Sequence, residues 1–105
     1  MNEDLKKRID ELVHGHRVVL FMKGSPFAPM CGFSASAIQT LREAGATDVA
    51  SVNVLTDPEI REGIKEYSNW PTIPQIYIDG KFVGGCDIIK DLQERGELAP
   101  MIKGS

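Results

Sequence analysis

An uninterrupted apolar run is the feature that most constrains what this chain can fold into. From Arg17 to Met22 the sequence reads Arg-Val-Val-Leu-Phe-Met, without alternation of polar and apolar side chains. Such a run predicts a strand buried on both faces of its sheet, because a strand with one solvated face alternates. The sheet therefore needs helices on each side.

A loop rich in proline and glycine follows the predicted strand. Lys23 to Met30 contains Gly24, Pro26 and Pro29, a composition that predicts no regular structure. Cys31 comes directly after this loop, and a helical pattern follows it at once. One cysteine is thus expected where a buried strand hands over to a helix N-terminus. Sheets of the α/β class usually place their sites at such strand ends.

The remaining elements follow from hydrophobic periodicity and from turn residues. Asp57-Pro58 is a helix start, and Asp79-Gly80 between two short apolar runs is a strong hairpin signal. In the helix after that hairpin, we expect Ile88 and Ile89 to point inward. The predicted helices are Asn2–Val13, about Gly32–Ala44, Asp57–Ser68, Asp87–Arg95 and a short Glu97–Ile102; the predicted strands are Arg17–Met22, Val49–Val54, Gln75–Ile78 and Lys81–Val83.

The order of these elements predicts an α/β fold. The first strand-helix-strand unit makes a right-handed parallel pair, whereas the final hairpin is antiparallel. We therefore expect a mixed four-stranded sheet flanked by helices on both faces. With 105 residues, the chain fits a single domain over 1–105.

Charge and cysteine count exclude several classes of protein. A formal net charge of −3 argues against a general binder of nucleic acid or of membrane surfaces. No apolar run approaches the roughly 20 residues of a membrane span. Two cysteines are too few for a secreted disulfide scaffold, so we expect a reducing compartment. This is a bacterial cytoplasm, or an organelle matrix if a presequence has been removed.

Cys31 is the first candidate for chemistry, and two interpretations are open. A free cysteine is commonly a small buried hydrophobe. However, a helix N-terminus and the nearby Lys23 both favour a thiolate. Gly32 would let a ligand or another backbone approach closely. A redox dithiol would read Cys-x-x-Cys, but the fourth position here is Ser34. We favour a single reactive cysteine.

Two further stretches are candidates for binding. Trp70-Pro71-Thr72-Ile73-Pro74 is either a proline-stiffened loop around a core tryptophan or a backbone edge for an extended ligand. Gly84-Gly85-Cys86-Asp87 is either a hairpin end, with Asp87 capping its own helix, or an anion site at a helix N-terminus. The residues alone leave both pairs of alternatives open.

Several other residues have bland interpretations. Arg61 and Lys65 lie four apart on one helix face and would ordinarily be solvated. His14 and His16 flank a glycine, with no other plausible metal ligand nearby in the sequence. Met30 is expected to be a packing residue.

Taken together, the three candidate stretches resemble the monothiol glutaredoxins, the class with Cys-Gly-Phe-Ser at its active site. The match extends from the first helix to about Leu98 and includes the long loop from Lys23 to Cys31. The resemblance implies a thioredoxin fold and a glutathione site. The residues that it implies for catalysis, glutathione and cluster binding are Cys31, Gly32, Phe33, Lys23, Arg61, the backbone of Ile73 before a cis Pro74, Cys86 and Asp87.

The resemblance also implies a function. It suggests a carrier of a labile [2Fe–2S] cluster, with Cys31 as the protein's metal ligand and glutathione completing the set. The carrier would be a homodimer with the cluster and a monomer without it, with BolA-type proteins and apo iron–sulfur proteins as partners. The alternative is a glutathione-dependent oxidoreductase that acts on mixed disulfides through Cys31, with turnover expected to be secondary. A redox switch through a Cys31–Cys86 bond is a third hypothesis.

Overall fold

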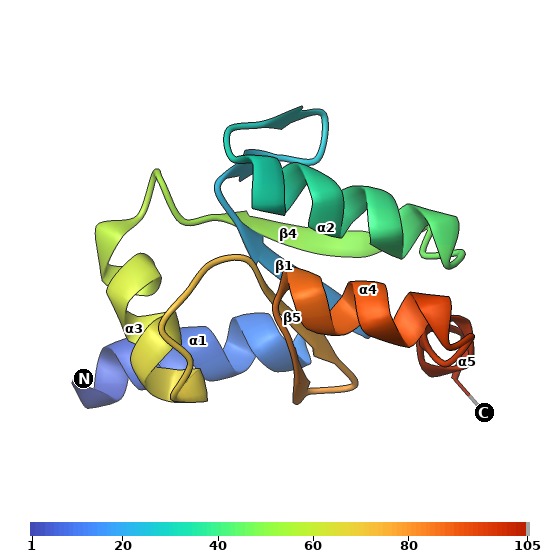
Figure 1. Cartoon of the computed structure of the whole chain (residues 1–105). Helices are drawn as coiled ribbons and strands as arrows, with labels where there is room; N and C mark the ends of the chain where they lie inside the picture. The colour runs from blue at the N-terminus through green and yellow to red at the C-terminus, as the bar shows by residue number, and fades with distance from the viewer. Residues whose placement is uncertain (105) are drawn as a thin grey trace.

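The structure is a computed structural model that describes residues 1–104. Helices and strands alternate along most of the chain (Figure 1). The helices are α1 (Glu3–His14), α2 (Gly32–Glu43), α3 (Pro58–Ser68), α4 (Cys86–Glu94) and α5 (Leu98–Lys103); the strands are β1 (Val18–Met22), β2 (Gly24–Ser25), β3 (Ala28–Pro29), β4 (Val49–Asn53), β5 (Gln75–Ile78) and β6 (Lys81–Gly84).

A mixed four-stranded sheet lies at the centre, as predicted. Its strand order is β4-β1-β5-β6. β1 pairs in parallel with β4, and it pairs antiparallel with β5, which in turn pairs antiparallel with β6. β1 is thus an interior strand, and all five of its residues are buried. The predicted turn at Asp79-Gly80 joins β5 to β6, with both residues at positive φ, as a tight two-residue hairpin requires.

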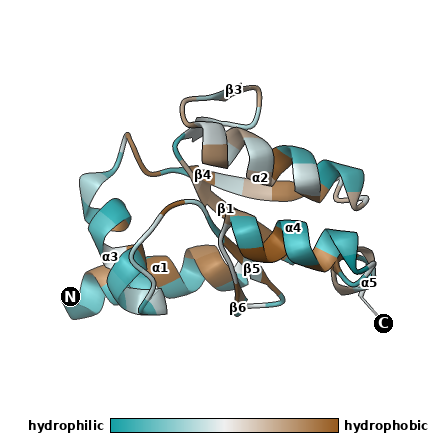
Figure 2. Cartoon of the chain, viewed as in Figure 1, coloured by the Kyte–Doolittle hydropathy of each residue, from teal (hydrophilic) through white to brown (hydrophobic). Residues whose placement is uncertain are grey.

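Helices cover both faces of the sheet, and the side chains of β1 alternate between two cores. Leu20 and Met22 pack with α2, α4 and α5, whereas Val19 and Phe21 pack with α1 and α3. Figure 1 shows α2 beside α4 on one side of the sheet and α1 beside α3 on the other. In Figure 2 the outer helices carry hydrophobic and hydrophilic stripes. One face of each helix therefore contributes to a core.

The loop before Cys31 departs from the prediction of irregular structure. β2 and β3 form a small hairpin in which Gly24 pairs with Pro29 and Ser25 with Ala28. Gly24 has φ +91°, and a Cβ there would lie 2.5 Å from the carbonyl oxygen of Ala28. Glycine therefore permits a close two-residue pairing, so that the prolines interrupt the ladder without preventing it.

Two apolar side chains lie outside the core, contrary to expectation. Met30, predicted to pack, is 71% exposed at the end of the hairpin. Ile88, predicted to point inward, is 41% exposed, whereas its neighbour Ile89 is fully buried. Consecutive residues of a helix differ in direction by about 100°, and α4 has only one face against the sheet. Ile88 instead lines a cavity at the start of α4.

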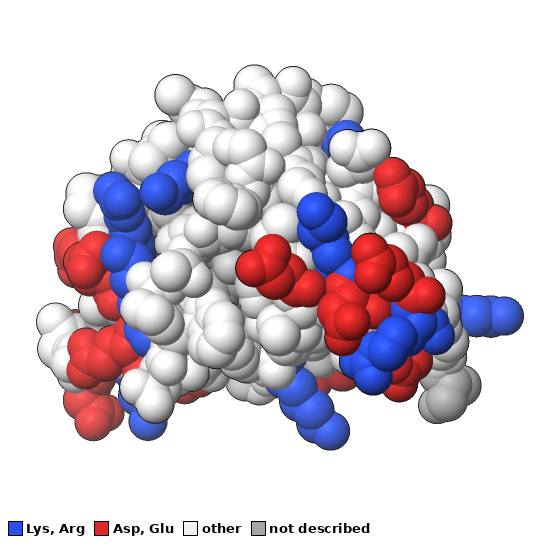
Figure 3. All heavy atoms as spheres, in the orientation of Figure 1, with Lys and Arg blue, Asp and Glu red and all other residues white. Residues whose placement is uncertain are grey.

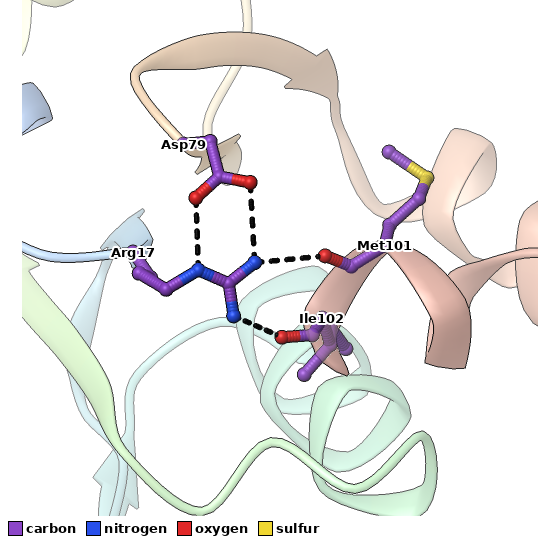
Figure 4. Close-up of polar contacts among 4 residues, drawn as sticks. All are labelled: Arg17, Asp79, Met101 and Ile102. Atoms are coloured by element: carbon purple, nitrogen blue, oxygen red, sulfur yellow. Dashed lines mark hydrogen bonds and ion pairs between the residues drawn. The ribbon is translucent and has the colours of Figure 1, made fainter. Parts of the chain in front are cut away.

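The end of the sheet away from Cys31 is held by Arg17. Its guanidinium donates to both carboxylate oxygens of Asp79, at 2.8 and 3.1 Å, and to the carbonyl oxygens of Met101 and Ile102 (Figure 4). The β5–β6 turn and the end of α5 are thereby tied to the start of β1. Among residues 1–104, no helix has the length and apolar character needed to cross a bilayer.

Candidate functional site

Cys31 is the N-cap residue of α2. Its backbone is extended (φ −156°, ψ 134°), its side chain is partly exposed, and its thiol is free. The buried β1, the β2–β3 hairpin and the start of α2 fix this position. The sequence predicted the buried strand and the helix start, but not the hairpin between them. The interpretation of Cys31 as a small buried hydrophobe is therefore wrong.

The surroundings of Cys31 lower the pKa of its thiol. The largest cause is the backbone N–H of Ser34, and the N–H of Phe33 and the hydroxyl of Ser34 act in the same direction. Partial burial opposes them, and the charge of Lys23 adds a smaller lowering effect. The sulfur makes no complete capping hydrogen bond, so these donors stabilise the thiolate mainly by their orientation toward it.

Three neighbouring cavities run from the basic side chains of α3 to Cys31. The first, of about 170 Å³, shares Thr72 and Ile73 with the second, and the second shares Phe33, Cys86 and Asp87 with the third. The second and third have volumes of about 420 Å³ each. Every site residue predicted from the sequence lines one of them: Lys23, Arg61, Ile73, Pro74, Cys86, Asp87, Phe33, Gly32 and Cys31.

The first cavity is cationic. Lys23, Arg61 and Lys65 line it together. Nζ of Lys65 lies 3.2 Å from Glu62, the one acidic partner that any of the three has within residues 1–104. The buried Nε of Arg61 has no hydrogen-bond partner among the described residues. A buried N–H without an acceptor is costly, so this cavity suits a ligand that brings an anionic oxygen. Figure 3 shows basic side chains at the upper left of the view, an uncharged area beside them, and a mixed group of acidic and basic side chains at the right.

The loop from Trp70 to Pro74 forms the wall of the first two cavities. The peptide bond between Ile73 and Pro74 is cis. The amide of the buried Gln75 supports the loop from below, since its Nε2 donates to the carbonyl oxygens of Trp70 (3.0 Å) and Thr72 (3.3 Å). Trp70 is half-buried and lines the second cavity, so it is not simply a core tryptophan.

The three cavities together form a groove. The start of α4 lines its second and third cavities, away from the basic side chains of α3. Gly85 is the N-cap and the helix begins at Cys86, so the interpretation of Asp87 as the cap of its own helix is wrong. Asp87 instead lies exposed in the first turn and lines two of the cavities. A Cβ on Gly85 would lie 3.3 Å from the carbonyl oxygen of Pro74. The absence of a side chain thus lets the helix start approach the cis-proline loop.

Cys31 and Cys86 line the same cavity but are not bonded to each other. Cys86 is 7% exposed, whereas Cys31 is partly open to solvent. The redox-switch hypothesis therefore stays a prediction.

Two residues that line the Cys31 cavity were missed by sequence reasoning. They are Ser36 and Lys90. Ser36 lies four residues after Gly32, and Lys90 lies four after Cys86. Residues four apart share a helix face, and this spacing was the signal that could have found both.

The two histidines lie elsewhere. Nε2 of His16 is 3.2 Å from Asp48, and Nδ1 of His14 is 2.8 Å from the carbonyl oxygen of Asp10. No group of three or more His, Cys, Asp or Glu side chains within residues 1–104 could hold a metal ion. A cavity of about 620 Å³, larger than those of the groove, lies between the C-terminal end of α2 and α5, without either cysteine.

Comparison with known proteins identifies the family. The glutaredoxin family model matches residues 18–83, from β1 into β6. The chain belongs to the glutaredoxin family. It is 52% identical over 103 residues to an uncharacterised monothiol glutaredoxin of Synechocystis, covering 98% of this chain and 95% of that one. It is 47% identical over 105 residues to mitochondrial monothiol glutaredoxin-5 of Saccharomyces cerevisiae, covering 98% of this chain and 70% of the yeast protein.

Solved structures place the fold in the same family. Reduced poplar apo GrxS14 superposes with a TM-score of 0.81 at 48% identity, covering 94% of this chain and 90% of the poplar chain. A buckwheat glutaredoxin in complex with glutathione superposes with a TM-score of 0.83 at 24% identity, covering 98% and 94% of the two chains. The predicted thioredoxin fold of the glutaredoxin type is therefore confirmed.

Proposed function

We propose that this protein binds glutathione along the three cavities, with the glutathione thiol beside Cys31. Glutathione carries two carboxylates separated by a short extended peptide. Lys23 and Arg61 suit one carboxylate, the backbone of Ile73 suits the peptide, and the N–H groups at the start of α4 suit the other carboxylate. The exposed carboxylate of Asp87 suits the α-amino group next to that second carboxylate.

A single observation carries this proposal. The buried Nε of Arg61 lacks an acceptor in a cavity that Lys23 also lines. Membership of the glutaredoxin family supports the same ligand.

Calorimetric titration with glutathione tests the binding site. We expect Arg61→Ala to weaken the affinity at least about tenfold, since charge-assisted hydrogen bonds contribute about 1.5–3 kcal/mol. Arg95→Ala is the matched control, because Arg95 pairs with Asp91 and Glu97 away from the groove. Equal affinities for the two variants would refute the assignment of Arg61.

For the cargo, we infer a labile [2Fe–2S] cluster that is delivered to apo-proteins in iron–sulfur assembly and iron homeostasis. Such clusters take four ligands, usually thiolates. Cys31 is partly exposed and its pKa is lowered, so it suits a thiolate ligand. Two chains and two glutathiones supply four thiolates. The cluster-bound form is accordingly proposed as a homodimer and the apo form as a monomer.

The partners and compartment follow from this role. The proposed partners are apo iron–sulfur proteins and a BolA-type protein. Residues 1–105 are proposed to act as one glutaredoxin domain. With one relative from a cyanobacterium and another named as mitochondrial, the proposed compartment is a bacterial cytoplasm or an organelle matrix.

Anaerobic reconstitution with iron, sulfide and glutathione tests the carrier function. The wild-type protein is expected to give a coloured dimer by absorption spectroscopy and size-exclusion chromatography. Cys31→Ser should lose the cluster, whereas Cys86→Ser, which alters a buried thiol, should largely keep it. A colourless monomer from the wild type would contradict the proposal.

A second candidate function is glutathione-dependent disulfide exchange, which the lowered pKa of Cys31 favours. The Cys31 thiolate attacks the glutathione sulfur of a mixed disulfide, and the substrate thiolate leaves and takes up a proton. A second glutathione thiolate then attacks the Cys31–glutathione disulfide, which yields glutathione disulfide and regenerates Cys31. Rapid turnover of a glutathionylated substrate would rank this function above the carrier.

A further inference from the structure

The hydroxyl of Ser34 connects α2 to the backbone of Lys23. Ser34 is fully buried in the first turn of α2. Its Oγ accepts a hydrogen bond from the backbone N–H of Lys23 at 3.1 Å. Lys23 lines the cationic cavity, and Cys31, three residues before Ser34, lines the cavity at the opposite end. This hydrogen bond therefore joins the residue that carries the cation to the helix that carries the thiol.

Two other hydrogen bonds hold the backbone at and next to Lys23. The Lys23 carbonyl oxygen accepts from the N–H of Met30 at 2.9 Å, and the next N–H, of Gly24, donates to Oδ1 of Asn53 at 3.0 Å. The first support lies on the exposed hairpin and the second leads to β4. Among residues 1–104, the Ser34 hydroxyl alone connects the backbone of Lys23 to a buried point on α2.

We propose that Ser34 is a positioning residue that fixes Lys23 relative to Cys31 for glutathione binding. This inference rests on the proposed glutathione site. The Cα of Lys23 is the point from which its ammonium group reaches the cavity. A firmly held backbone therefore limits the region that the four rotatable bonds of the side chain can cover. Ser34 thus contributes to the site as a hydrogen-bond acceptor, in addition to removing the second thiol of a Cys-x-x-Cys motif.

The same geometry bears on a cysteine at position 34. A thiol is a weak hydrogen-bond acceptor, and it is larger than a hydroxyl. Cysteine at this buried position would therefore supply a second thiol to Cys31 while losing the tie to Lys23. We expect a reduced Ser34→Cys variant to resemble Ser34→Ala in glutathione affinity.

A double-mutant cycle tests the positioning role. In calorimetric titrations, Ser34→Ala should weaken glutathione binding about three- to tenfold, the usual value of a neutral hydrogen bond. In a Lys23→Ala background the same change should cost little further affinity, because its effect acts through Lys23. Thr40→Val is the matched control, since it removes another buried hydroxyl of α2, which donates to the Ser36 carbonyl oxygen within the same helix.

Two results of these titrations would overturn the inference. One is an equal loss of affinity in both backgrounds, as expected of a general structural effect. The other is an affinity that Ser34→Ala leaves unchanged.

Amide hydrogen exchange at Lys23 provides a readout that needs no ligand. The wild-type amide should exchange slowly, and Ser34→Ala or reduced Ser34→Cys should accelerate it while the core of β1 stays protected. An unprotected Lys23 amide in the wild type would overturn the inference even if no variant folded. If the wild type bound no glutathione, the proposed function would fail, whereas a protected Lys23 amide would still support the tie to Ser34.

Discussion

At the scale of the residue, Cys31 derives its chemistry from its place at a helix start. Its thiolate is favoured by N–H groups of the first turn more than by a neighbouring cation, since the charge of Lys23 lowers the pKa less than those donors do. The start of α2 therefore lowers the pKa of the Cys31 thiol before any ligand binds. A substitution of Lys23 is accordingly expected to affect glutathione affinity more than thiol reactivity.

The pH dependence of alkylation tests this effect. Because the pKa of Cys31 is lowered, its thiolate persists to a lower pH than that of an ordinary thiol, whose pKa is about 8.5. The rate of carboxamidomethylation at Cys31, located by mass spectrometry, should therefore reach half its maximum at a lower pH in the folded protein than in denaturant. In denaturant the midpoint should return to the ordinary value. A folded-state midpoint at or above the denatured one would contradict the role of α2.

At the scale of the element, the loop from Trp70 to Pro74 depends on a buried amide beneath it. Gln75 donates to two loop carbonyls, and its Oε1 accepts from the hydroxyl of Tyr77 at 3.4 Å. Both the oxygen and the nitrogen of this buried amide are thus hydrogen-bonded. Buried amides satisfied in this way specify one conformation of the backbone around them.

Replacement of Gln75 by methionine should loosen this loop. Methionine has a similar shape but cannot donate, so the Trp70 and Thr72 carbonyls would lose their partner. We expect the free energy of unfolding to fall by about 2–4 kcal/mol, with weaker glutathione binding, as measured by denaturant titration and calorimetry. Gln39→Met is the control, because the amide of Gln39 reaches only the exposed Glu43. Equal stability of the two variants would show that the loop keeps its conformation without the Gln75 amide.

At the scale of the whole molecule, local patterns predicted the layers but not the contacts across them. The run from Arg17 to Met22 predicted an interior strand, and Asp79-Gly80 predicted the hairpin, because each depends on neighbouring residues alone. The roles of Gln75 and Ser34 depend on which distant carbonyl or N–H the fold brings to them, and no local pattern encodes that. The β2–β3 hairpin was missed because its two prolines suggested irregularity while Gly24 permitted the pairing.

The groove shows the same division. The family resemblance predicted that Arg61, Ile73 and Asp87 share one glutathione site. In the structure all three line the same series of cavities. Ile88 was misplaced because periodicity fixes a helix face only to within a neighbouring position, and α4 is short. For side chains at the border of a helix face, the sequence therefore predicts burial least well.

Arg17 links three distant segments at the end of the molecule opposite Cys31. Its replacement by methionine, which keeps an apolar stem, should release the β5–β6 turn and the end of α5 without disturbing the groove. We expect a several-fold faster amide exchange in α5 with unchanged glutathione affinity. Arg95→Met is the matched control, since Arg95 pairs with the nearby Asp91 and Glu97.

The same contact should respond to acid. Arg17 lowers the pKa of Asp79, so the contribution of the pair is present above the ordinary carboxyl pKa and is lost as the pH falls through the lowered value. In the wild type, protection of α5 should therefore decline in acid, relative to that of Arg17→Met measured at the same pH. An equal decline in both proteins would show that α5 is held by Leu98 and Ile102 in the core, and that Arg17 is dispensable.

A loss of glutathione affinity in Arg17→Met would instead show that the two ends of the sheet are coupled.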